Sequence, residues 1–175
     1  MFTPVELDLE RGWPGRIDGD EVVQLAAQTL QSFFSGGGQA REHAVYPLAE
    51  VVLRAPVLHP PSVRIFDGDD FRFANPAAIV VGGVEPEPPA GATELVPKRR
   101  RAAIVGAGGA IGGFVDLVEW TAPQLSGEKS RDFALALGPV VTTPDEAAPS
   151  DTDWERLVAH AAANTRLFPG DVIAR

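Results

Sequence analysis

The alternation of apolar and polar residues predicts a chain built mostly of short strands. Apolar residues run through Arg101–Val105 and again through Phe114–Trp120, which predicts two strands. The segment FALALGPVVTT predicts an extended pair that bends at Gly138-Pro139. The segments YPLAEVVLRAPVLHPPSVRIF and FRFANPAAIVVGG predict further short extended pieces, with a turn at Asn75-Pro76. The last residues, FPGDVIAR, predict a turn and a final strand.

Helical spacing occurs in two places. The segment IDGDEVVQLAAQTLQSFFSGGG predicts a helix that Asp18 or Asp20 caps and that Gly36–Gly38 end. Near the C-terminus, Thr152 and Glu155 have the spacing of a capping box. The helix predicted after it carries its apolar residues on one face: Trp154, Leu157, Val158, Ala161 and Ala162.

Composition narrows the function classes. The 175 residues, 45% of them apolar, suffice for one globular domain with a small annex. A net charge of −9 argues against nucleic acid or an anionic membrane as the main partner. The absence of cysteine excludes disulfides, thiolate metal sites and cysteine nucleophiles. Without a signal-peptide pattern or a good membrane span, we expect a cytoplasmic protein.

The glycine-rich stretch KRRRAAIVGAGGAIGGF raises the question of a dinucleotide cofactor. A dinucleotide-binding loop needs G-x-G-x-x-G at the start of a helix. Here the spacing is G-x-G-G-x-x-G, and a strand pattern follows. We therefore predict a tight glycine turn between two antiparallel strands, and no cofactor.

Several motifs, in order, resemble the fumarylacetoacetate hydrolase (FAH) family. GEKSRDFALALGPVVTTPDE is similar to the family pattern GKSKDF…LGPWVVTPDE, and FRFANPAAI to FYFSNPAAI. LFPGDVI resembles LRPGDVI, and GWPGRIDGDEVVQLAAQTLQSFF resembles the small N-terminal domain. The resemblance implies a mixed α+β fold with an FAH-like β-roll and few helices. It divides the chain into an N-terminal lobe with its connection, 1–60, and a truncated catalytic-type domain, 61–175. It also implies a homodimer.

The same resemblance implies a changed site. The family holds a divalent metal with an E-x-E pair and an aspartate; the pair falls on Lys98 and Arg100, and the aspartate on Glu119. Two cations then stand where carboxylates are needed, so we predict no divalent metal there. The family segment with the catalytic histidine is missing around residues 66–71. Its lysine is kept as Lys129.

Two interpretations of the cations stay open. Lys98 and Arg100 either bind a substrate carboxylate, form an internal salt bridge with Glu119, or make a solvated basic edge. Lys129 either acts as a general acid or base or holds an enolate oxygen, or it pairs with Asp132 or a carbonyl at a strand end. Glu119 is the second candidate for proton transfer. His43, His59 and His160 have no partner spacing for metal or catalysis: each is expected to be structural.

Three functions are compatible with these residues. The first is an enzyme that acts without metal on an enolisable keto-acid or β-dicarbonyl substrate, by C–C cleavage, decarboxylation, isomerisation or cyclisation, in a specialised biosynthetic pathway. The second is an inactive FAH-like protein that serves as a binding or partner subunit. The third is an ordinary metal-dependent hydrolase that recruits Glu85, Glu87 or Glu94 as ligands.

Overall fold

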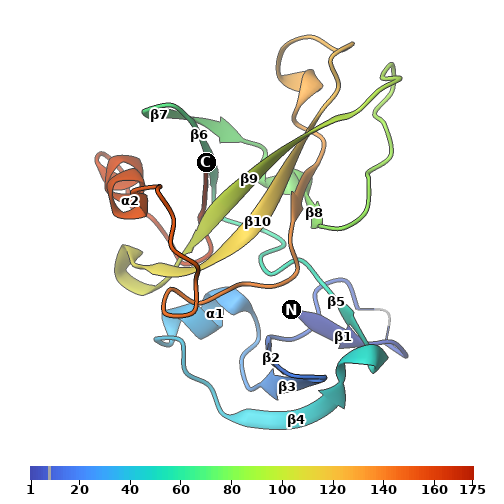
Figure 1. The fold of residues 1–175 in the computed structure, drawn as a ribbon, viewed down its shortest axis with the longest axis vertical. Helices are drawn as coiled ribbons and strands as arrows, with labels where there is room; N and C mark the ends of the chain where they lie inside the picture. The colour runs from blue at the N-terminus through green and yellow to red at the C-terminus, as the bar shows by residue number, and fades with distance from the viewer. Residues whose placement is uncertain (8) are drawn as a thin grey trace.

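The computed structural model describes residues 1–7 and 9–175 and consists mainly of strands (Figure 1). The N-terminal part contains a two-stranded and a three-stranded sheet. In the first, β1 (Phe2–Pro4) pairs with β5 (Val51–Leu53). The second has the order β2 (Gly15–Asp18), β3 (Glu21–Leu25) and β4 (Glu42–Pro47). This arrangement, together with the larger sheet, confirms the predicted mixed α+β class with few helices.

A seven-stranded mixed sheet forms the larger part of the molecule. Its strand order is β7 (Asp70–Ala74), β6 (Val63–Asp67), β12 (Val172–Ala174), β9 (Val96–Val105), β10 (Ile111–Thr121), β11 (Leu135–Leu137) and β8 (Ile79–Val81). The β11–β8 and β12–β6 pairs are parallel, and the other pairs are antiparallel. The predicted division of the chain at 60/61 stays a prediction.

The glycine-rich stretch is the turn between β9 and β10. Val105 pairs with Ile111, and Gly108 and Gly109 have φ angles of 64° and 85°. A side chain is strained at such angles, which explains glycine at these two positions. The predicted turn between antiparallel strands is confirmed.

The predicted N-terminal helix is wrong in its first half. Residues 15–25 form the β2–β3 hairpin, in which Asp18 ends β2 and Asp20 belongs to the turn, so neither caps a helix. Gly19 has a φ of 58°, and the β-branched Val22 and Val23 suit a strand, so the turn and propensity outweigh the helical spacing. The helix α1 is only Leu30–Ser35. Thr29 caps its start, and Gly36 ends it.

The C-terminal helix is confirmed as α2 (Trp154–Ala162), but its cap is Asp153, whose side chain accepts a hydrogen bond from Arg156 N. The predicted extended pair around residues 135–143 is shorter than expected, because only β11 and an isolated bridge at Thr142 form. Short 3-10 turns cover 48–50, 76–78, 107–109 and 127–130.

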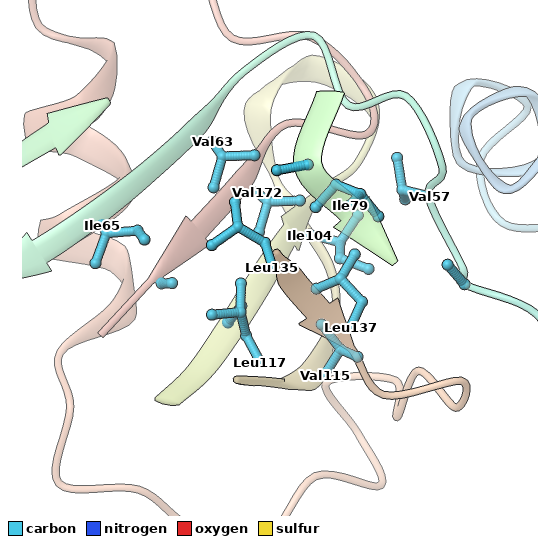
Figure 2. Packing of buried hydrophobic residues seen from close by; sticks show 14 of the residues in the cluster. Val57, Val63, Ile65, Ile79, Ile104, Val115, Leu117, Leu135, Leu137 and Val172 are labelled. Carbon is cyan, nitrogen blue, oxygen red and sulfur yellow. The ribbon is translucent and has the colours of Figure 1, made fainter. Parts of the chain in front are cut away.

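Each face of the large sheet has its own core. Side chains from β6, β8, β9, β10, β11 and β12 point towards one another on the inner face, as Figure 2 shows for Ile65, Ile104, Leu117 and Leu135. On the outer face, α2 packs on Phe66, Ala103 and Ile173. Because side chains alternate along a strand, the residue number decides which core a side chain joins.

Candidate functional site

The strand β9 brings Lys98 and Arg100 to the inner face of the sheet. Ala102 and Ile104 of this strand are fully buried in the inner core, and Arg100 is two residues before Ala102. Alternation therefore directs Arg100 to the inner face. Lys98, two residues before Arg100, lies on the same face at the end of the apolar surface. Arg99 and Arg101 belong to the opposite face.

The neighbouring strand β10 supplies the carboxylate. Glu119 is in phase with Val115 and Leu117, which are inner-core residues, and it lies directly across from Lys98 in the ladder. Its side chain is only 3% exposed. A buried carboxylate must be compensated by hydrogen bonds and opposite charge, so its partners decide what this site can do.

Two further members come from the β6–β7 hairpin, and the sequence interpretation missed both. Asp67 is in phase with the inner-core residues Val63 and Ile65, and Arg72 lies opposite Ile65. The hairpin turn at Gly68, with φ 86°, produces this register. The signal was present in the DGDD turn, which sets the two strands in phase, but only the assembled sheet carries the hairpin to β9 and β10.

Together these five residues form a charged cluster: Asp67, Arg72, Lys98, Arg100 and Glu119. The Arg100 Nε and Nη2 atoms donate to Glu119 Oε2 at 3.2 and 3.1 Å. Arg72 Nη2 donates to Glu119 Oε1. Asp67 Oδ1 accepts from Arg100 Nη2 and Lys98 Nζ, both at 2.9 Å. Both oxygens of Glu119 are thus held by guanidinium groups.

Exposure increases from the inside of the charged cluster to its rim. The Arg100 side chain is 4% exposed, whereas Arg72 is 24%, Asp67 50% and Lys98 55% exposed. Three cations against two carboxylates leave a formal charge of +1. The charged cluster therefore has a neutral buried pair, Arg100–Glu119, and a cationic rim.

The pKa of the Asp67 carboxyl reflects the positive charges at this rim. Desolvation alone would raise the pKa of Asp67, but the hydrogen bonds and charges of Lys98 and Arg100 outweigh it. The result is a pKa lowered from the usual 3.8 to about 2. Asp67 is accordingly ionised at neutral pH, and its charge is taken up by the two cations.

Lys129 lies apart from these contacts. It belongs to the 3-10 turn Gly127–Ser130 that follows β10, its side chain is 81% exposed, and its Nζ lies 2.6 Å from Asp132 Oδ2. Within the described part of the chain, no hydrogen bond or ion pair joins Lys129 to the charged cluster. The structure thus brings Lys98, Arg100 and Glu119 together and leaves Lys129 paired with Asp132.

The donor set does not fit a divalent metal. Hard cations need several oxygen ligands, yet Asp67 and Glu119 are both held by cationic side chains. Residues 1–7 and 9–175 contain no group of three or more His, Cys, Asp or Glu side chains that could hold a metal ion. Glu85, Glu87 and Glu94 are exposed, in the irregular segment before β9.

A cavity lies elsewhere, between the N-terminal strands and the large sheet. Its volume is ≈ 790 Å³, and its lining includes Phe2, Arg16, Phe34 and Thr142. Its lining contains no member of the charged cluster and not Lys129. Figure 1 shows the N-terminal strands at the end of the molecule opposite the start of β9, where the charged cluster lies.

Comparison with solved structures identifies the scaffold. The chain is similar to maleylpyruvate hydrolase from Sphingobium sp. SYK-6 in complex with manganese(II) and pyruvate, with a TM-score of 0.76 and 20% identity over 93% of this chain and 84% of that one. This chain has the FAH-family fold. Two other structures with this fold are also similar to the chain.

One is 5-carboxymethyl-2-hydroxymuconate delta-isomerase from Mycobacterium smegmatis, with a TM-score of 0.73 and 20% identity over 93% of this chain and 81% of that one. The other is 2-hydroxyhepta-2,4-diene-1,7-dioate isomerase from Mycobacterium marinum, with a TM-score of 0.69 and 20% identity over 93% of this chain and 80% of that one. By name, these three neighbours are a hydrolase and two isomerases.

The predicted resemblance to the FAH family is confirmed at the level of the fold. No family model matches the chain, and no curated protein matches it in sequence. No helix in the described residues is long and apolar enough to cross a membrane.

Proposed function

We propose that this chain is a small-molecule enzyme that uses the FAH fold without a metal ion and acts on an enolisable keto-acid or β-dicarbonyl compound. The observation that carries the proposal is the +1 charge of the charged cluster, in which cationic side chains surround the two carboxylates. The names of the fold neighbours, which include a structure with pyruvate bound, support a small carboxylate as the ligand class.

The rim of the charged cluster is the better candidate for contact with substrate. Arg100 directs its donors to Glu119, Asp67 and the Phe66 carbonyl oxygen, so it has little capacity left. Lys98 is more than half exposed, whereas Arg72 Nε is buried and lies 3.8 Å from Asp67 Oδ2. A substrate carboxylate would therefore meet Lys98 first.

The chemistry supported is stabilisation of an enolate. In such reactions, negative charge develops on an oxygen, and fixed cations lower the energy of that state. Arginines hold both oxygens of Glu119, which favours a positioning role for this residue over proton transfer. Lys129 stays the proposed acid or base, and it would have to leave Asp132 to act.

Turnover in the presence of a chelator tests the proposal. Oxaloacetate and acetopyruvate serve as probes, with EDTA present, and loss of enol absorbance is followed together with product by NMR. We expect turnover with EDTA that drops at least about tenfold in Lys98→Ala, whereas Arg99→Ala on the opposite face retains it. Turnover that EDTA abolishes and Mn²⁺ restores would contradict the proposal.

A second candidate is an inactive partner subunit. It is favoured by the buried Arg100–Glu119 pair, which neutralises two of the expected site residues. β7 and β8 also end the strand order of the large sheet, and terminal strands offer backbone groups to another chain. A homodimer or hetero-assembly fits this candidate. Light scattering at micromolar concentration tests it, and a monomer would count against it.

A further inference from the structure

Arg100 occupies an unusual place between two carboxylates that come from different strands. Its Nη2 atom lies 2.9 Å from Asp67 Oδ1 on β6 and 3.1 Å from Glu119 Oε2 on β10. One nitrogen of a buried guanidinium thus joins two acidic side chains far apart in the sequence.

We infer that the Arg100 guanidinium is a built-in cation that excludes divalent metal ions from the charged cluster, and that charge reversal at positions 98 and 100 converts the cluster into a divalent-metal site. The inference sharpens the metal independence in the proposed function, but it is tested by metal binding and does not require turnover.

The exclusion follows from charge and from space. A divalent ion near Asp67 and Glu119 would meet the positive charges of Arg100, Lys98 and Arg72 at short range, in a partly buried site where repulsion is weakly screened. It would also have to displace the guanidinium that now contacts both carboxylates. No gain from two shared carboxylates offsets three adjacent cations.

The conversion follows from the side-chain directions already present. Lys98 contacts Asp67, and Arg100 contacts Asp67 and Glu119, so glutamates at 98 and 100 would face the same two carboxylates. The variant cluster would then hold four carboxylates, the oxygen-rich set that Mg²⁺ and Mn²⁺ prefer. Glutamate is shorter than arginine, so the space that the guanidinium leaves is available to an ion and its water ligands.

The test compares the wild type, Lys98→Glu/Arg100→Glu and the control Arg99→Glu/Arg101→Glu. The control has the same change of net charge on the same strand, on the opposite face. Binding of Mn²⁺ is measured by the loss of its free EPR signal and by calorimetry, and melting temperature is measured with Mn²⁺ or EDTA.

We expect the variant with glutamates at 98 and 100 to bind one Mn²⁺ with a Kd on the order of 10⁻⁵–10⁻⁴ M, and to melt at a higher temperature with Mn²⁺ than with EDTA. The wild type and the control should bind none at these concentrations. Binding by the wild type that is lost in Asp67→Asn would overturn the exclusion, and a folded double variant without Mn²⁺ binding would overturn the conversion.

Should the double variant be unfolded without metal, refolding with Mn²⁺ becomes the measurement, with far-UV circular dichroism as the readout. Metal-dependent recovery supports the inference, and the absence of recovery contradicts it. Turnover by the wild type with EDTA is a separate result, so failure of the proposed function and failure of this inference are distinguishable.

Discussion

The two faces of the large sheet each contain a buried ion pair, and the two pairs are built differently. On the inner face, both Glu119 oxygens accept hydrogen bonds from guanidinium groups. On the outer side, Asp171 accepts from the Ser62 hydroxyl at 2.6 Å and the Phe168 amide at 2.7 Å, whereas its nearest Arg64 nitrogen is 4.0 Å away.

The difference shows what each carboxylate does. Asp171 closes the turn that leads into β12, and neutral donors suffice for that task. Arg64 Nη1 donates to the Ser62 hydroxyl, and its guanidinium lies over the rings of Phe71 and Phe73. Glu119 closes no turn, and within residues 1–7 and 9–175 its side chain pairs with the charged groups of Arg72 on β7 and Arg100 on β9, so it acts by balancing charge. The Arg64–Asp171 pair therefore belongs to the local structure of a turn, whereas the Arg100–Glu119 pair belongs to the charged cluster.

The largest effect is expected from loss of the Glu119 charge. In Glu119→Gln, Arg72 and Arg100 keep their charges without a buried counterion, so the free energy of unfolding should fall by about 3–5 kcal/mol. Urea unfolding measures it, with the exposed Glu128→Gln as the control. A change as small as that of the control would mean that Glu119 is not needed as a buried counterion for Arg72 and Arg100.

The outer pair should be less sensitive. Asp171→Asn keeps one acceptor oxygen but turns an amide group towards a donor. We therefore expect the free energy of unfolding to fall by about 1–3 kcal/mol. Double-mutant cycles should also give a smaller coupling for Arg64–Asp171 than for Arg100–Glu119. Equal couplings would remove the distinction between the two faces.

Acid should weaken the rim of the charged cluster through Asp67. The folded-state pKa of Asp67, about 2, lies below its usual 3.8. Its ionised form therefore stabilises the folded state above about pH 4, and this contribution is lost as the pH falls towards 2. Asp67→Asn should remove that part of the pH dependence. The measurement is the free energy of unfolding of the wild type and of Asp67→Asn as a function of pH, from pH 5 to 2. Parallel curves for the two proteins would contradict the prediction.

Lys129 should matter least for stability. The Lys129 side chain is 81% exposed, so Lys129→Ala should change the free energy of unfolding by less than about 0.5 kcal/mol. If Lys129 is the acid or base, the same variant loses turnover while its melting temperature is kept. Asp132→Asn is the matched control, because it breaks the ion pair but retains the lysine. Full turnover in Lys129→Ala would exclude a catalytic role.

Elements whose signals are local can be predicted from the amino-acid sequence alone. The apolar runs of β9 and β10, the glycines of the turn between them, the face of α2 and the turn before β12 all follow from spacing within a few residues. The ordered FAH-like motifs identified the fold for the same reason, because each motif describes one segment.

The other features of the molecule depend on the assembled fold. It made residues 15–25 a hairpin where helical spacing competed, because the Gly19-Asp20 turn and strand pairing stabilise that alternative. It also brought Asp67 and Arg72 to Arg100 and Glu119. Contacts between residues so far apart in the chain depend on strand order and register, and no local pattern encodes them.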